Sequence, residues 1–200
     1  LQKEIITLVE NTAIEGFSAL NAQALREKIE DIRKVKKAFV KFSTDGLVIV
    51  NVIERKEAVV FFNNDLYEVL DGNGVILSIK QNYEGLSSLP LLVGKDASKN
   101  INALLALVNE MGSYQSEVLY YEWVGERRWD IHMKSELVFK LPENNLNKGL
   151  EVMRMFLHET NKLSKPVVSV DLRNIDKPII RFKKAPPVEY IQKNTRRFAG

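Results

Sequence analysis

In the first part of the chain, the spacing of hydrophobic residues changes from that of a helix to that of a strand. Apolar residues share one helical face over 1–11, and again after Asn21, which is the expected N-cap of a second, amphipathic helix. Alternation with a period of two then predicts strands over 38–42 and 47–53. Because the 43–46 loop between them contains Asp-Gly, we expect a hairpin. The order helix, helix, hairpin predicts a small α+β unit.

The rest of the chain predicts more strands, with two helices among them. The sequence Asp-Gly-Asn-Gly at 71–74 predicts a second hairpin, because Gly and Asn tolerate the positive φ of tight turns. Helical spacing predicts one helix over 101–111, ending at Gly112, and another from 144 to about 162. Since strands and helices are partly segregated, the pattern favours an α+β fold over a doubly wound α/β sheet. Strands are predicted over 58–62, 67–70, 75–79, 118–123, 129–133, 137–141, 166–170 and 179–182.

Composition excludes several kinds of functional site. The chain has no cysteine, which excludes disulfides, thiolate metal sites and cysteine nucleophiles. The two histidines, His132 and His158, are far apart and lack the spacing of a metal-binding helix. There is no Gly-x-Ser-x-Gly nucleophile elbow and no glycine-rich phosphate loop. We therefore predict no catalytic residue, no cofactor and no metal.

Charge is concentrated at the C-terminal end. The formal net charge is +3, and residues 181–200 carry six basic side chains and one acidic side chain. The remainder is close to neutral, which argues against a nucleic-acid-binding domain, because such a domain lines a folded face with basic residues. We interpret the basic tail, 188–200, as a solvated end or as a weak contact to an anionic lipid or polymer.

Four carboxylates are candidates for an acid–base pair: Glu54, Asp71, Asp130 and Asp171. A structural interpretation fits them better. Asp71 lies in a predicted turn, Asp130 faces outward on a predicted strand, and Glu54 ends a strand. We expect exposed ion pairs, which contribute only about 0–1 kcal/mol to stability and need no functional reason.

The run 178–184 has the features of a strand at the edge of a sheet. It begins with Pro178, which edge strands tolerate. It also carries Arg181, Lys183 and Lys184, charges of the kind that keep sheet edges from aggregating. An exposed edge can accept an additional strand from a partner. The alternative is a strand that is paired on both sides within the fold.

Five short motifs are spread along the chain. A strand over 47–58 ends in Glu-Arg-Lys-Glu-Ala, and Asp-Gly-Asn-Gly-Val follows at 71–75. Leu-Pro-Leu-Leu-Val-Gly stands at 89–94, Arg-Trp-Asp-Ile at 128–131, and Val-Asp-Leu-Arg at 170–173. In order and spacing, along essentially the whole chain, these motifs resemble those of the FtsQ/DivIB family of bacterial division proteins.

The resemblance implies a POTRA-like N-terminal domain over 1–57, followed by a larger β-sheet domain with two helices over 58–187. It also implies a cytoplasmic tail and one transmembrane helix upstream of Leu1, so that this chain would lie on the periplasmic side of the cell inner membrane. Family members are non-enzymatic scaffolds of the divisome. They bind FtsB and FtsL and link early and late division proteins.

By resemblance, partner binding falls on the strands that follow Asp-Leu-Arg. We expect an FtsB-like or FtsL-like protein to meet a charged rim around a small apolar centre of Ile179 and Phe182. The chain departs from the family pattern where Asn174 replaces an aromatic residue, where Glu57 replaces a proline, and where a first POTRA strand is expected before Leu1. The candidate residues are Arg127, Arg128, Arg173, Asn174, Ile175, Asp176, Ile179, Arg181 and Phe182.

Two other functions stay open at this point. The first is a POTRA-type periplasmic chaperone that passes outer-membrane polypeptides along its hairpin edge. A second POTRA unit or a barrel in the full-length gene would favour it. The second is a hydrolase with an unrecognised site, which a screen of ester, phosphate and glycoside substrates would detect.

Overall fold

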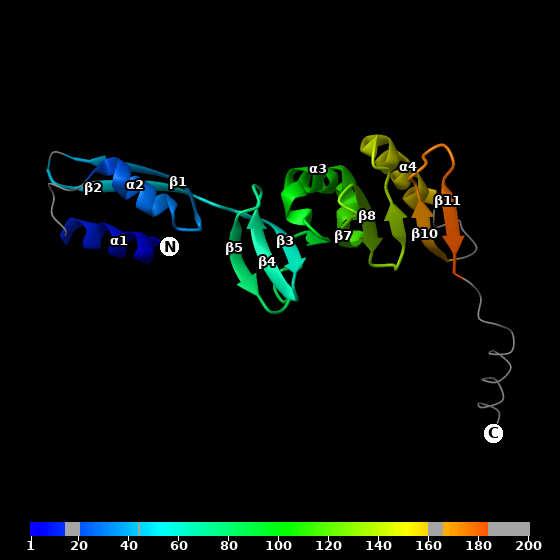
Figure 1. Cartoon of the computed structure of the whole chain (residues 1–200), viewed down its shortest axis with the longest axis horizontal. Coiled ribbons are helices and arrows are strands. Elements are labelled where there is room, and N and C mark those ends of the chain that lie inside the picture. The colour runs from blue at the N-terminus through cyan, green and yellow to red at the C-terminus, as the bar shows by residue number, and fades with distance from the viewer. Residues whose placement is uncertain (15–20, 44, 160–165, 184–200) are drawn as a thin grey trace, which may run out of the picture. The chain divides into compact units, whose positions relative to one another are not determined.

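The computed structural model describes residues 1–14, 21–43, 45–159 and 166–183 (Figure 1). The chain divides into two units by its internal contacts. The first comprises Leu1–Val93 with Ala97–Leu105, and the second comprises Gly94–Asp96 with the chain from Ala106 onward. Within the described residues the four helices and the mixed β-sheet confirm the α+β class. The predicted domain boundary at residue 57 stays a prediction.

The first unit begins with the predicted order of helix, helix and hairpin. Its elements are α1 (Gln2–Ile14), α2 (Ala22–Glu30), β1 (Val35–Phe42) and β2 (Val48–Glu54), and β1 pairs antiparallel with β2. Asn21 is the N-cap of α2, as predicted, because its side chain accepts a hydrogen bond from the Gln23 N–H at 2.9 Å. Ile5, Leu25, Ile29, Val35 and Ala38 form a buried core between the helices and the inner face of the hairpin.

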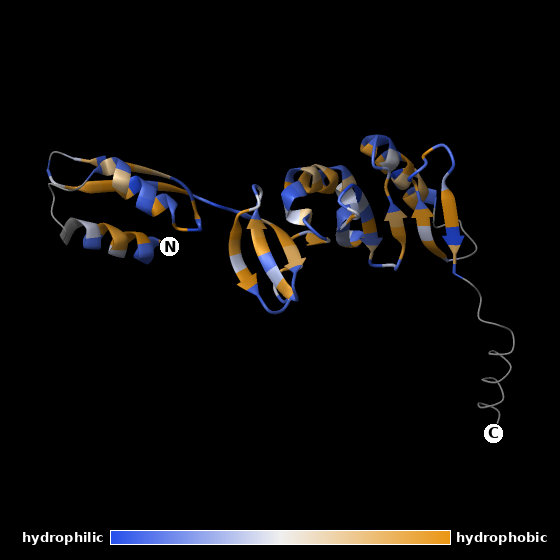
Figure 2. Cartoon of the chain, in the orientation of Figure 1, coloured by the Kyte–Doolittle hydropathy of each residue, from blue (hydrophilic) through white to orange (hydrophobic). Residues whose placement is uncertain are grey.

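Four further strands complete the first unit. They are β3 (Glu57–Asn63), β4 (Leu66–Asp71), β5 (Ile76–Lys80) and β6 (Leu91–Val93), hydrogen-bonded in the order β6-β3-β4-β5. The β3–β6 pair is parallel and the others are antiparallel. Val60, Val69 and Leu86 are buried in a second core. In Figure 2 these strands are mainly hydrophobic, whereas the loops that join them are hydrophilic.

The helix α3 (Ile101–Met111) begins in the first unit and ends in the second. Gly112 follows it with a φ of 54°, which confirms the predicted glycine stop. The second unit continues with β7 (Val118–Val124), β8 (Arg128–Met133), β9 (Val138–Lys140), α4 (Leu146–Glu159), β10 (Val167–Asp171) and β11 (Ile179–Phe182). The end predicted for the last helix, near Lys162, lies outside the described residues.

The strands of the second unit are hydrogen-bonded in the order β11-β10-β9-β8-β7. The β9–β10 pair is parallel, so α4 is the crossover that connects them. α4 buries Gly149, Leu150 and Met153. The ring of its Phe156 meets that of Phe139 on β9 edge-on, with centroids 5.8 Å apart. This packing determines where β10 and β11 lie.

The prediction that Asp71 and Asp130 belong to exposed ion pairs is wrong, because both residues are buried, at 3% and 5% exposure. Asp71 accepts a hydrogen bond from Arg55 Nη1 at 2.7 Å, and others from the N–H groups of Asn73 and Val75, both at 2.9 Å. Asp130 accepts one from Arg128 Nε at 3.1 Å.

The surroundings of the two carboxyls move their pKa values in opposite directions. Burial raises the pKa of Asp71, but the N–H groups of Val75 and Asn73 and the Arg55 guanidinium together hold it below its usual value. At Asp130, burial raises the pKa above its usual value despite the opposing effect of Arg128.

We expect Asp71→Asn to lower the free energy of unfolding by about 1–2 kcal/mol at neutral pH, because the half-buried Arg55 loses its charged partner. A carboxyl with a depressed folded pKa stabilises the fold above its unfolded pKa of about 3.9, and this stabilisation is lost as pH falls through the folded pKa. Wild type and variant should therefore converge in strongly acidic urea titrations. The pKa of Asp130 is shifted in the opposite direction, so the pH dependence of the total stability combines both carboxyls. The effect of Asp71 is therefore measured as the difference between wild type and variant at each pH.

The matched control is Asp31→Asn, an exposed aspartate at the end of α2. We expect it to leave the urea midpoint nearly unchanged. A constant gap between wild type and Asp71→Asn at all pH values would contradict the role given to the Asp71 charge.

Candidate partner-binding edge

The strand β11 lies at the edge of the sheet. Among the described strands it pairs only with β10, in antiparallel register, with Asp171 opposite Ile179 and Val170 opposite Ile180. All four of its residues are exposed. The predicted edge strand is thus confirmed for residues 179–182. The alternative, a strand paired on both sides, does not hold within the described chain.

Two hydrogen bonds show which backbone groups of β11 point towards β10 and which point away from the sheet. The N–H of Leu172, at the end of β10, donates to Lys140 O in β9 at 2.8 Å, and that of Lys183 donates to Pro166 O at 2.9 Å. Since the N–H and C=O of successive residues in a strand point to opposite sides, Asp171 bonds towards β11, and Ile179 and Arg181 bond towards β10. The N–H and C=O groups of Ile180 and Phe182 therefore point away from the sheet.

The side chains of β11 divide between the two faces. Ile180 lies opposite Val170, on the face where Phe139 packs against α4, and Phe182 shares this face. Ile179 and Arg181 lie on the other face. Ile179, Ile180 and Phe182 are 63%, 40% and 42% exposed. The predicted single apolar centre of Ile179 and Phe182 is therefore wrong, because positions three apart on a strand face opposite sides. In Figure 2, β11 begins hydrophobic and becomes hydrophilic near its end.

The structure does not bring Arg127 and Arg128 to this edge. Arg128 begins β8, and β9 and β10 lie between β8 and β11. Its side chain is largely buried and donates to Asp130. Arg127 lies in the turn before it, where its N–H donates to Val124 O at 3.3 Å.

Arg173, by contrast, is adjacent to the edge. Its Nε donates to the two carboxylate oxygens of Asp171 at 2.9 and 3.0 Å, and its Nη2 also donates to that carboxylate. These hydrogen bonds lower the pKa of Asp171. Because Asp171 faces Ile179 across the hairpin, this ion pair, which has no net charge, lies beside the start of β11.

The loop between β10 and β11 contains the other three candidates. Asn174 Oδ1 accepts from the Asp176 N–H, and Asn174 O accepts from the Lys177 N–H, each at 3.2 Å. The loop borders a polar cavity of about 510 Å³. Its walls are Pro142, Glu143, Asn144, Asn145, Lys148, Arg173, Asn174, Ile175 and Asp176.

The candidate set missed Ile180. Its backbone and side chain are both exposed at the edge, and period-two alternation from Phe182 is the signal that identifies it. The contribution of Lys148 to the cavity carried no signal in the sequence, because the start of α4 meets the loop only in the folded structure.

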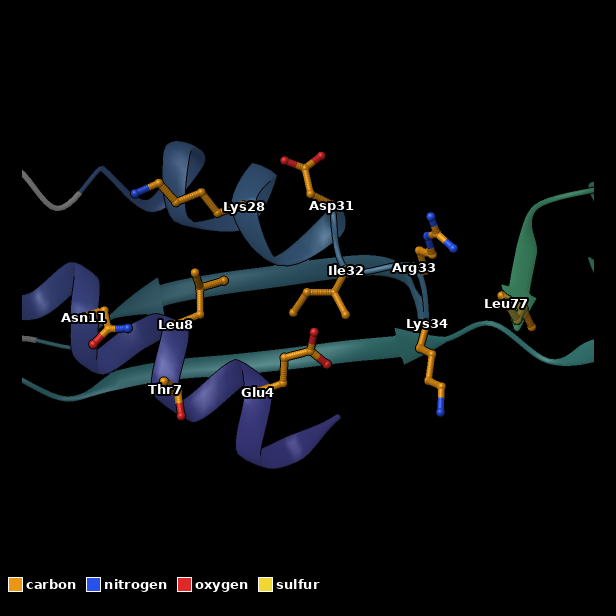
Figure 3. A pocket seen from close by; sticks show the side chains of 10 residues that line it. All are labelled: Glu4, Thr7, Leu8, Asn11, Lys28, Asp31, Ile32, Arg33, Lys34 and Leu77. Carbon is orange, nitrogen blue, oxygen red and sulfur yellow. The ribbon is translucent and has the colours of Figure 1, made fainter. Parts of the chain in front are cut away.

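Another pocket, of about 620 Å³, lies in the first unit (Figure 3). Glu4, Leu8 and Ile32 point into the space between α1 and the turn before β1, whereas Asp31 and Arg33 point away from it. The remaining lining residues are Thr7, Asn11, Lys28, Lys34 and Leu77. Its charged groups do not converge on a point where a substrate would be held.

Over the described ranges, no cluster of three or more His, Cys, Asp or Glu residues is placed to hold a metal ion. No helix in the same ranges combines the length and the apolar character that crossing a membrane requires.

Comparisons with known proteins show which family this chain is similar to. The family model "Cell division protein FtsQ/DivIB, C-terminal" matches residues 58–173. Cell division protein FtsQ of Rhizobium radiobacter is 28% identical over 186 residues, which are 91% of this chain and 88% of that protein. The FtsQ proteins of Agrobacterium fabrum and Bradyrhizobium diazoefficiens are 28% and 27% identical. The chain covers 58% and 53% of their lengths, little more than half.

A solved structure, the major extracytoplasmic domain of the cell division protein DivIB from Geobacillus stearothermophilus, matches 56% of this chain and 99% of its own, at 14% identity. Its TM-score is 0.40, too low to bear on the fold. The family model matches more than half of the residues. The chain therefore belongs to the FtsQ/DivIB family of cell division proteins.

Proposed function

We propose that this chain is a non-enzymatic scaffold of the divisome that binds membrane-anchored FtsB-like and FtsL-like proteins by adding a strand of the partner to β11. The single observation that carries the proposal is that the backbone N–H and C=O groups of Ile180 and Phe182 point away from β10 and have no strand partner among the described residues. In this proposal residues 1–57 are a POTRA-like domain, and an upstream transmembrane helix holds the chain on the periplasmic side of the cell inner membrane. Family membership supports the role in division.

The edge defines the chemistry of the added strand. Each backbone hydrogen bond gained would contribute about 0.5–1.5 kcal/mol, so affinity comes from the ladder together with apolar contacts. On one face the partner would place apolar side chains against Ile180 and Phe182. On the other it would meet Arg181, which favours a carboxylate or another acceptor there. Partner strands with this alternation fit the edge.

Ile180→Pro tests strand addition without disturbing the fold. Proline removes an N–H that points away from β10, and edge strands tolerate proline at such positions. We expect the affinity for the periplasmic segment of an FtsB-like protein from the same organism to fall about tenfold or more, as one hydrogen bond is lost and the ring blocks approach. Calorimetric titration measures the affinity, and the urea midpoint should stay close to that of wild type.

Ile180→Val is the matched control, because it keeps the N–H and a β-branched side chain, and it should bind like wild type. As a second pair, Ile179→Glu and Phe182→Ala should abolish pull-down of the partner while the circular dichroism spectrum stays unchanged. If Ile180→Pro binds as tightly as Ile180→Val, the partner does not add a strand at β11.

A further inference from the structure

The outer face of the β1–β2 hairpin is exposed and rich in apolar and cationic side chains. In the antiparallel register Lys37 lies opposite Ile53, Phe39 opposite Asn51, and Lys41 opposite Ile49. We call these six residues the hairpin face. Phe39, Ile49 and Ile53 are 49%, 44% and 49% exposed, although the other side of the same strands packs on α1 and α2. None of the described residues covers the hairpin face.

The charge of the hairpin face has one sign. Its strand positions include two lysines and no carboxylate. Glu54, at the end of β2, lies on the inner side, where it lines a cavity with Val48, Val50 and Val52. Lys37 Nζ lies 5.1 Å from the centre of the Phe39 ring, so that ammonium group and aromatic ring share one patch. The surface that this face fits is therefore both apolar and anionic.

The arrangement of side chains on the hairpin face indicates which kind of surface it would contact. Protein interfaces concentrate apolar residues in a centre and place charges at the rim. Here each lysine lies directly opposite an isoleucine, so apolar and cationic groups alternate across one plane. At a lipid interface, apolar side chains enter the boundary with the acyl chains while the long lysine stems keep their ammonium groups at the phosphates. A second copy of the chain would bring another cationic face against this one, which like charges oppose.

We infer that the hairpin face docks on an anionic phospholipid surface. Phe39, Ile49 and Ile53 would enter the interface, and Lys37 and Lys41 would pair with lipid phosphates. Leu47, which immediately precedes β2 and is 60% exposed, extends the apolar area towards the turn. This inference is independent of the partner proposed for β11, because it involves other residues in the other unit.

Co-sedimentation with vesicles of equal parts phosphatidylglycerol and phosphatidylcholine tests the inference on the whole chain. We expect binding to these vesicles and little to phosphatidylcholine alone. Lys37→Gln with Lys41→Gln should weaken the partition coefficient about 25-fold, about fivefold for each lysine. Phe39→Ser with Ile53→Ser should weaken it about tenfold or more. The circular dichroism spectrum checks that each variant is folded.

The matched control is Lys3→Gln with Lys28→Gln, which removes the same charge from exposed positions of α1 and α2. It should bind vesicles like wild type, because neither lysine lies on the hairpin face and the basic tail is the same in every variant. Equal binding by the two lysine pairs would overturn the inference. An absence of vesicle binding would overturn it as well. Capture of an acidic amphipathic peptide of alternating Glu and Leu, or self-association in analytical ultracentrifugation, would then show which other surface covers the hairpin face.

Discussion

Gly94→Ala is expected to lower the free energy of unfolding of the second unit by about 3–5 kcal/mol. Gly94 has a φ of 120°, a conformation that residues with a side chain rarely adopt. A Cβ added there would lie 3.1 Å from Trp123 N and 3.2 Å from Trp123 C, and closer still to the Trp123 carbonyl oxygen. These are backbone atoms of β7, which cannot move aside as a flexible side chain does. The energetic costs of the strained backbone and of the steric clash therefore add.

Gly112→Ala separates the two causes. Gly112 also has a positive φ, of 54°, but nothing lies within 4 Å of an added Cβ. We expect this control variant to lower the free energy of unfolding by about 1–2 kcal/mol, the cost of a positive φ alone. Urea unfolding followed by tryptophan fluorescence is the measurement, because both tryptophans, Trp123 and Trp129, lie in the second unit with ring centres 4.7 Å apart. Similar losses for the two variants would refute the close approach of Gly94 to Trp123.

Gly149→Ala is expected to destabilise the protein by about 2–3 kcal/mol, whereas the same substitution in an ordinary helix interior stabilises by about 0.5–1 kcal/mol. An added Cβ would lie 2.5 Å from Cδ and 2.8 Å from Cγ of Pro142. Because a proline ring is rigid, α4 would have to move away from the end of β9. Thermal or urea unfolding gives the sign directly.

The double variant Gly149→Ala with Pro142→Ala tests this explanation. Removing the ring should restore most of the lost stability, so the two changes should couple by more than 1 kcal/mol in a double-mutant cycle, within the range of about 0.5–3 kcal/mol seen for contacting residues. A Gly149→Ala protein that is more stable than wild type would show that α4 has room at this position.

Local patterns predicted the elements well, because each pattern reports a property of a short segment. Asn21 was identified as a cap, Gly112 as a helix stop, and the strand at 179–182 by its proline and its charges. Ile180 was missed although alternation alone pairs it with Phe182. Charge and family motif indicate the other candidate residues, and neither criterion detects a backbone N–H that points away from the sheet.

What the sequence did not reveal depends on contacts between distant segments. Arg55 reaches the buried Asp71 across sixteen positions, a contact that the turn sequence does not predict. The pairing of Arg128 with Asp130 follows from their two-residue spacing on one strand. The separation of this pair from β11 does not follow from the local sequence. It depends on the parallel pairing of β9 with β10, which the crossover helix α4 makes possible.

That crossover has a genetic consequence. The helix α4 and the Pro142 contact set the position of β10, and β10 in turn carries β11. If β11 binds a division protein as proposed, alleles that alter residues 142–150 should therefore impair septation with the same phenotype as alleles in 179–182, although residues 142–150 are not part of β11. A screen that scores only filamentous growth would group the two sets together, and suppressors that act by repacking the helix would rescue the first set but not the second.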